Sequence, residues 1–404
     1  MKKKDHLLFG VVAIGLIGIA AVFFFLILPR WLSSPQPAET ASIGYGSDAV
    51  RAEIVDVIEE GTVQLGEQEQ EYQIFRIELL EGEFAGTLME IDYGKRQIRP
   101  EGLDLAPGDR MIVTVGKDPE GILNAYFIDY VRTRSLLWLF VTFMVFSILI
   151  SGWKGVRGLI GMAISLGVIL LYIIPQILQG GDPIWISVSG AFFILAVTLY
   201  LIYGWTLKTH AAVLSTLISL VVTALLASFF VNLTRLTGFG SEEALFLLQQ
   251  SDIPINLRGL VLGGMLIGAL GVLDDLIITQ SSVVFELHDS NPGMAFGDLF
   301  RRAMRVGQDH VAATVNTLVL AYAGAALPML MLFSLSGEQV SYLLNLEFVT
   351  EEIVRTFVGS LGLIAAVPLT TLLACLVALH HERLGPLRKY LGPKTIETGH
   401  TNGH

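Results

Sequence analysis

The chain has 404 residues, of which 53% are hydrophobic and only 16% charged, with a mean hydropathy of +0.63 and a net charge of −11. Soluble proteins carry about 25% charged residues, so this composition excludes a soluble globular protein and predicts a polytopic membrane protein. Residues 38–131 hold 20 acidic and 7 basic residues, a balance of −13, so the remainder of the chain is only slightly basic. Neither part has the strongly basic surface that nucleic acid requires, and we expect no nucleic-acid partner.

The first element in chain order is an apolar run over residues 7–28, which follows the basic lead MKKKDH. A secretory signal has a shorter apolar core, of about 7–15 residues. We therefore expect residues 1–31 to form an uncleaved anchor helix with its N-terminus in the cytoplasm. Residues 32–50 are rich in Pro, Ser, Gly and Ala, which is typical of a linker.

Residues 51–131 change character, because apolar and polar residues alternate in short segments separated by turn residues. This pattern predicts a small all-β module, either a barrel or a sandwich, and the number of strands makes an OB-like barrel a candidate. Aromatic residues of the module could form a binding face or, as is commoner, fill its core: Tyr72, Phe75, Tyr93, Tyr126 and Phe127. The predicted strands are 52–58, 72–80, 87–93, 110–116 and 124–131.

From residue 135 to residue 379 the chain is nearly continuous apolar sequence, which predicts a domain of seven membrane helices. With 7–28 the protein would have about eight transmembrane helices. Residues 380–404 form a basic tail, partly disordered, on the cytoplasmic side. The seven predicted spans are 135–151, 158–178, 184–204, 210–231, 257–284, 310–335 and 353–379.

The orientation follows from the distribution of lysine and arginine, which concentrate in cytoplasmic segments of membrane proteins. With both termini in the cytoplasm, the inner segments collect most of the basic residues and the outer loops hold mainly acids. The β-module is then extracytoplasmic. Arg235, Arg258 and Arg355 lie near outer helix ends, where arginine can reach lipid headgroups, and we give them no site.

Two adjacent carboxylates, Asp274 and Asp275, stand within the predicted sixth helix. A charge at the centre of a membrane helix costs at least about 2.5–3.5 kcal/mol, so such residues usually have a partner or a task. Helical geometry turns Asp274 about 100° away from Asp275. One half of the helix face that contains Asp275 carries small residues, which suit the close approach of another helix, and the other half carries polar residues. This face comprises Gly264, Gly268, Gly271, Asp275, Thr279, Ser282 and Glu286.

The continuation of this helix to Glu286 is too long for one straight span of a bilayer core about 30 Å thick. Either the helix protrudes into the cytoplasm, or it breaks near Asp274 and Asp275 and exposes backbone carbonyls in a cavity, as transporters do for coupling ions. Both alternatives stay open at this point.

Residues 294–306 are amphipathic, with three arginines on one side, and suit either the anionic inner leaflet or an ordinary loop helix. In the seventh predicted span, Asn316 could bind Asp275 or a permeating species, or make an interhelical hydrogen bond worth roughly 0.6 kcal/mol. Gly324 lies in a stretch of small residues that permits close helix packing, and Pro328 should kink the helix.

The sequence indicates no catalytic residue, no metal site and no cofactor. The only cysteine, Cys375, lies in an apolar run, and no HExxH, GxSxG or P-loop motif is present. A DDxxD phosphate–metal motif fails because Ile278 stands at its last position. We expect that the protein is not an enzyme.

Residues 268–275 (GALGVLDD), with Thr279, Ser281, Ser282, Glu286 and residues 309–328, resemble the YibE/F family of bacterial membrane proteins. The resemblance covers residues 51–383. It implies an N-terminal anchor, an outer β-module and a multi-pass region in the bacterial cell membrane. Asp275 matches the family aspartate, while Asp274 replaces a hydrophobic residue of many members and resembles an actinobacterial subgroup. The family carries no established activity to transfer.

Two functions from different classes fit these observations. The first is a permease or transporter of the lipid bilayer, with Asp275, Asp274, Thr279, Ser282 and Asn316 as candidates to bind a proton or cation and a small solute. The alternative is a non-transporting assembly, envelope or signalling component whose outer β-module contacts a membrane protein partner.

Overall fold

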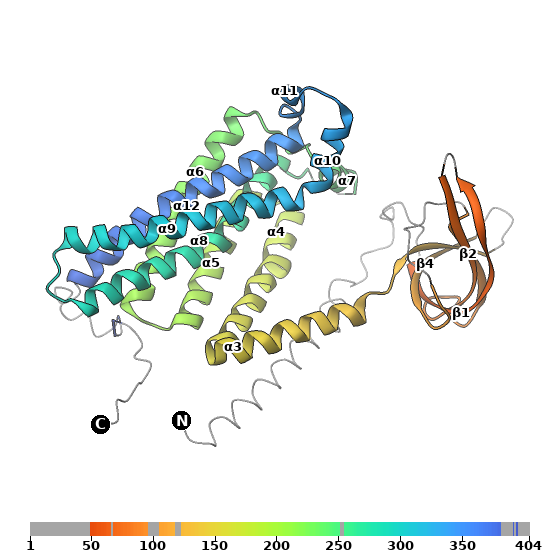
Figure 1. Ribbon diagram of the computed structural model, residues 1–404, viewed down its shortest axis with the longest axis horizontal. Coiled ribbons are helices and arrows are strands. Elements are labelled where there is room, and N and C mark those ends of the chain that lie inside the picture. The colour runs from red at the N-terminus through yellow and green to blue at the C-terminus, as the bar shows by residue number, and fades with distance from the viewer. Residues whose placement is uncertain are drawn as a thin grey trace, which may run out of the picture. The chain divides into compact units, whose positions relative to one another are not determined.

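The structure is a computed structural model that describes residues 49–65, 68–95, 105–117, 123–250, 254–380, 391 and 393–394 (Figure 1). The chain forms two compact units, residues 1–146 and 147–404, which are described separately below. The predicted anchor helix over 1–31, all of the predicted linker before Ala49 and most of the tail over 380–404 lie outside the described residues.

All five predicted strands are present in the first unit, where they form one antiparallel sheet of order β3-β2-β1-β4-β5 (Figure 1). Alternation of buried and exposed residues along β1 and β3 places one face of the sheet on a core. β1 begins two residues before the predicted module and is the longest strand. The strands are β1 (Ala49–Leu65), β2 (Gln68–Leu79), β3 (Leu88–Tyr93), β4 (Arg110–Lys117) and β5 (Leu123–Tyr130).

The sheet curls so that its two edge strands approach each other. The ring of Tyr93 in β3 lies 4.7 Å from that of Phe127 and 6.4 Å from that of Tyr130, both in β5. This strand order, with its edges brought together, agrees with the OB-like barrel that the number of strands suggested. Phe75 and Tyr93 are buried and fill the core of the module, which is the commoner role of such aromatic residues, whereas Tyr126 is exposed.

The second unit consists of helices, and local signals explain where several of them begin. Asp182, Thr206 and Asn256 cap three helices by accepting hydrogen bonds from backbone amides of the first turn. The elements after the sheet are α3 (Thr133–Val168), η2 (Ile169–Ile173), α4 (Ile174–Leu178), α5 (Pro183–Tyr203), α6 (Leu207–Leu233), α7 (Glu242–Gln250), α8 (Leu257–Ser290), α9 (Phe296–Ala325), α10 (Leu327–Ser336), α11 (Val340–Leu343) and α12 (Glu347–His380).

Two predicted spans, 135–151 and 158–178, correspond to α3 with its continuation through η2 and α4. Gly152 interrupts α3 with φ 57° and ψ −133°, a backbone conformation that favours glycine. Apart from this kink, residues Thr133–Leu178 form one helical segment of 46 residues. The kink lies between the two spans that the sequence predicts.

Among the described residues, five helical segments are long and apolar enough to cross a membrane, or six when α9 and α10 count as one bent span. Four of them are α5, α6, α8 and α12, at the positions of predicted spans, and the fifth is the 46-residue segment. The protein is therefore a membrane protein with several apolar helices, and the number of eight stays a prediction.

The amphipathic segment 294–306 and the first part of the seventh predicted span run into each other as one unbroken helix, α9. The span then bends by 64° between α9 and α10. Pro328 stands in the first turn of α10, so the kink predicted for it is confirmed.

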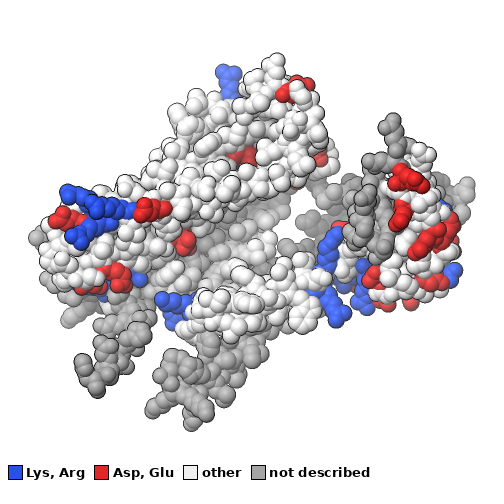
Figure 2. Space-filling model, in the orientation of Figure 1, with Lys and Arg blue, Asp and Glu red and all other residues white. Residues whose placement is uncertain are grey.

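The core of the helical unit lies where α5, α6, α8 and α12 meet, and it contains fully buried residues such as Leu195, Leu273, Ile277 and Ala366. On the face shown in Figure 2, the surface of the helices is largely uncharged. Basic side chains gather where α9 begins, at the exposed Arg301, Arg302 and Arg305.

Candidate functional site

The candidate site is built on α8, which packs against α5, α6, α9 and α12. α8 is continuous over 34 residues and so rises about 51 Å, well beyond the 30 Å of a bilayer core. It does not break at Asp274 and Asp275. Of the two alternatives, the structure has the continuous helix.

The two aspartates of α8 point into different surroundings, as the 100° turn between them predicts. Asp275 is exposed, whereas Asp274 is half-buried. Asp274 directly follows Leu273, which is fully buried in the core. Atom Oδ1 of Asp274 is buried and has no hydrogen-bond partner. Asp274 is thus the more enclosed of the two carboxylates.

Tyr203, at the end of α5, interacts electrostatically with both Asp274 and Asp275. An ionised carboxylate with an unpartnered oxygen in low dielectric costs several kcal/mol. A proton or a cation bound at Asp274 would remove that cost.

The glycines on the face of Asp275 are open rather than packed in the described chain. A Cβ atom added at Gly264 or Gly271 would meet nothing within 4 Å, and one at Gly268 only the Tyr322 hydroxyl at 3.7 Å. Gly324, in α9, is open in the same way. The close approach of helices occurs elsewhere on α8. A Cβ at Gly263 would lie 2.4 Å from Oγ of Ser187 in α5.

Within the described chain no helix packs closely on Gly264, Gly268, Gly271 or Gly324, and their role in receiving a neighbouring helix stays a prediction. At these positions of α8, α9 comes near only through the Tyr322 hydroxyl, 3.7 Å from a Cβ at Gly268. Only Leu299, Ala303 and Gly307 of α9 are buried, all in its first half.

The structure does not bring the remaining predicted residues together around Asp275. Thr279 and Ser282 are half-buried on α8, and Oγ of Ser282 donates to its own helix at the carbonyl of Ile278 (2.8 Å). Asn316 is exposed on α9, and among the described residues no hydrogen bond joins it to Asp275. Of the roles open to Asn316, the bond to Asp275 is therefore not formed within the part of the chain that the structure describes.

Sequence reasoning missed Gln280, which is the polar residue that joins three helices. Its Nε2 donates to the carbonyl of Ala303 in α9 (3.0 Å) and to the Thr371 hydroxyl in α12 (2.7 Å). Gln280 is 1% exposed. A buried amide within an apolar run was the available signal, because such a group needs partners.

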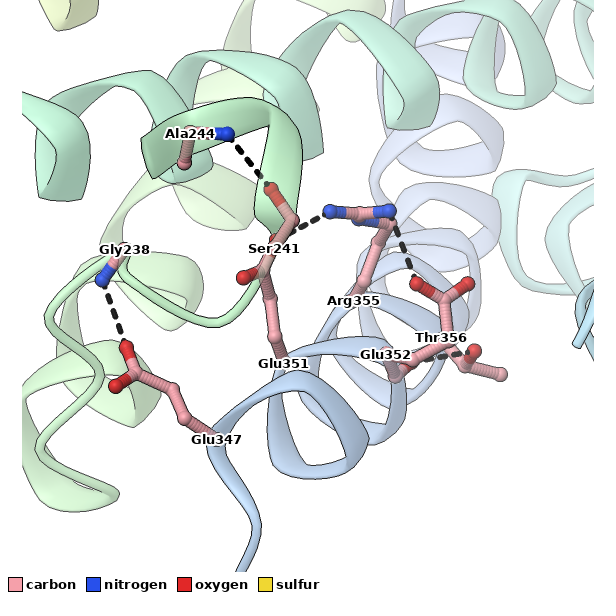
Figure 3. A network of polar contacts seen from close by, with 8 residues as sticks. All are labelled: Gly238, Ser241, Ala244, Glu347, Glu351, Glu352, Arg355 and Thr356. Carbon is pink, nitrogen blue, oxygen red and sulfur yellow. Dashed lines mark hydrogen bonds and ion pairs between the residues drawn. The ribbon is translucent and has the colours of Figure 1, made fainter. Parts of the chain in front are cut away.

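A second polar cluster joins the beginning of α12 to the loop between α6 and α7 (Figure 3). The carboxylate of Glu347 accepts hydrogen bonds from the amides of Thr237 (2.6 Å) and Gly238 (2.7 Å). Arg355 lies between Glu351 and Glu352 and pairs with both, at 2.5 Å and 2.9 Å. Arg355 thus has partners within the protein. Its position near a helix end had suggested only contact with lipid headgroups.

A family model described as YibE/F-like protein matches residues 139–380. The chain belongs to the YibE/F-like family. This match includes α8 with both aspartates, as well as α9 and α12, while the β-module precedes it. No curated protein and no solved structure matches the chain.

Proposed function

We propose that this YibE/F-like protein is a membrane transporter in which Asp274 and Asp275 of α8 bind a proton or a cation that moves with, or as, the substrate. The observation that carries the proposal is the buried, unpartnered Oδ1 of Asp274 in a helix long enough to span a membrane. Ionisable residues at such positions are costly and commonly mark ion pathways.

The open face of α8 supports the same function. Asp275 shares it with three glycines that no described atom covers, apart from the Tyr322 hydroxyl at Gly268. Small residues leave room beside the carboxylate for water or solute. Asp274, the residue before Asp275, is half-buried, so the open side of α8 and its enclosed side each carry one carboxylate.

The test is flux in liposomes that contain the full-length protein. We expect a proton or monovalent-cation flux, followed with an entrapped pH-sensitive or Na⁺/K⁺-sensitive dye, that falls at least tenfold in Asp274→Asn and Asp275→Asn. Asp289→Asn, at the exposed end of α8, is the matched control and should retain flux. Wild-type flux in both variants at positions 274 and 275 would exclude the carboxylate mechanism.

A second candidate function is a non-transporting assembly, envelope or signalling component. The observation that favours it is the β-module, a compact unit with its own buried core outside the region matched by the family model. In this case a membrane protein partner would co-purify with the full chain and be lost on deletion of residues 51–131, while reconstituted protein would give no flux of any ion tested.

A further inference from the structure

The first turns of α9 pack where three apolar helices of the helical unit begin or end. Leu299 and Ala303, both 0% exposed, lie in one buried cluster with residues of those three helices. Because α6, α8 and α12 are each long and apolar enough to cross a membrane, we expect their common end to lie in the headgroup layer of the bilayer. The residues that they contribute are Leu207 and Ala211 of α6, Val284 and Phe285 of α8, and Ala374, Cys375 and Ala378 of α12.

Three arginines of α9 face away from that packing. Helical geometry places Arg301, Arg302 and Arg305 within one arc of about 100°. All three are exposed, and they form the basic patch at the beginning of α9 (Figure 2). We call them the arginine face. Its centre lies about 150° from the centre of the packed side of the helix. The buried residues that define the packed side recur every four positions: Leu299, Ala303 and Gly307.

The charges of the arginine face are only weakly neutralised by the protein. Arg301 reaches Asp298 at 3.9 Å, but the two side chains are 72% and 62% exposed, and ion pairs so open to water are weak. Within the residues that the structure describes, Arg302 and Arg305 form no ion pair, and neither does Asp309, one turn further on. Like charges three positions apart on a helix repel each other. A bound anion would remove this repulsion, and guanidinium groups suit phosphate because each can donate two parallel hydrogen bonds to it.

Beyond the arginines, the same side of α9 continues as an exposed apolar strip. The strip starts one turn after Arg302, and an interval of seven residues keeps its members on one side of the helix. Asp309 and Asn316 lie between them as polar residues of this side. A ligand that matches both parts has a phosphate at one end and a hydrocarbon chain at the other. The apolar strip comprises Val306, Ala313 and Leu320.

We propose that the arginine face of α9 binds the phosphate of an anionic phospholipid, chiefly through Arg302 and Arg305, with a hydrocarbon chain of the lipid along Val306 and Ala313. The lipid is anionic because a zwitterionic headgroup carries its own cation, which offsets the attraction of its phosphate to the arginines. The site is separate from the aspartates of α8 and does not depend on the transport function.

The test is native mass spectrometry of the full-length protein in a neutral detergent, with phosphatidylglycerol or phosphatidylcholine of the same acyl chains added. We expect phosphatidylglycerol to bind at least about fivefold more tightly than phosphatidylcholine. Glycerol 3-phosphate, which has the phosphate but no acyl chain, should not displace phosphatidylglycerol at equal concentration. Displacement by glycerol 3-phosphate would identify a soluble anion as the ligand and overturn the proposal, as would equal affinity for the two lipids.

The double variant Arg302→Gln/Arg305→Gln should weaken phosphatidylglycerol binding at least about fivefold and leave phosphatidylcholine binding unchanged. Both side chains are exposed, so the variant should fold. The matched control is Arg51→Gln/Arg110→Gln, an equal charge change at two exposed arginines of the β-module, and it should bind phosphatidylglycerol as the wild type does. Unchanged binding in the α9 variant, or an equal loss in the control, would contradict a site on the arginine face.

Discussion

Gln280 of α8 donates a hydrogen bond of 2.7 Å to the hydroxyl of Thr371 in α12, and the two residues are 91 positions apart in the chain. Thr371 in turn donates to the carbonyl of Val367 one turn earlier in its helix (2.7 Å). Gly307 of α9 lies against the same pair of helices, where a Cβ would be 2.5 Å from Val367 and 2.8 Å from Oε1 of Gln280. Three helices therefore meet at one point.

Gly307→Ala should loosen this junction. The added methyl would overlap with Val367 and with the amide of Gln280, and overpacking of this kind costs about 1–3 kcal/mol. We expect a lower unfolding temperature in detergent, and less protection of α9 from proteolysis. Gly271→Ala is the control, because its Cβ would meet nothing within 4 Å. Equal stability of the two variants would contradict the packing at Gly307.

The adjacent glycines of α8 should respond differently to the same substitution. Gly263→Ala places a methyl 2.4 Å from Oγ of Ser187 and 3.2 Å from the carbonyl of Pro183, so the Ser187 side chain or α5 itself must shift. Gly264→Ala meets no atom within 4 Å. We expect Gly263→Ala to destabilise the folded protein by about 1–3 kcal/mol, and Gly264→Ala to have little effect, as measured by unfolding in mixed micelles. A larger loss at position 264 would show that a helix outside the described chain covers it.

Cysteine accessibility distinguishes the open face of α8 from its packed face. On a Cys375→Ala background, cysteines at positions 268, 271 and 275 should react with a water-soluble maleimide if the face lines an aqueous path. Cysteines at Leu273 and Ile277, which are not exposed, should stay unreactive. Reaction of the open face only with a lipid-soluble reagent would place it against lipid and count against the transport proposal.

Glu347 should hold the loop between α6 and α7 in place. In Glu347→Ala the amides of Thr237 and Gly238 lose their acceptor, and hydrogen bonds to charged groups are worth about 1.5–3 kcal/mol. Hydrogen–deuterium exchange at these two amides should become faster by at least tenfold, with the amides of the α8 core unchanged. Glu338→Ala, in the exposed stretch after α10, is the control, and equal exchange in both variants would show that the carboxylate does not fix the loop.

Local patterns were sufficient to predict the elements but not how their faces are paired. The alternation in β1 to β5, the apolar length of α5, α6, α8 and α12, and the effect of Pro328 all follow from properties of neighbouring residues. The divergent surroundings of Asp274 and Asp275 also follow from helical periodicity, because a turn of 100° separates adjacent side chains.

What could not be predicted depends on how far apart two helices lie. The glycines at 264, 268 and 271 are as small as Gly263, yet only Gly263 is approached closely by α5. Gln280 and Asn316 are both polar residues in apolar helices, yet the first is buried between helices and the second is exposed. A single sequence does not specify which small or polar residue meets a partner, since that depends on helix crossing geometry.

The continuity of α9 gives the protein a mechanical property. From its packed point at Gly307 to its end at Ala325 the helix extends about 27 Å without a break. Such a rod acts as a lever: tilting it by about 5° about Gly307 would displace its far end by about 2 Å. That end meets the 64° bend into α10, so a small displacement of the arginine-bearing first turns would become a larger displacement at the bend.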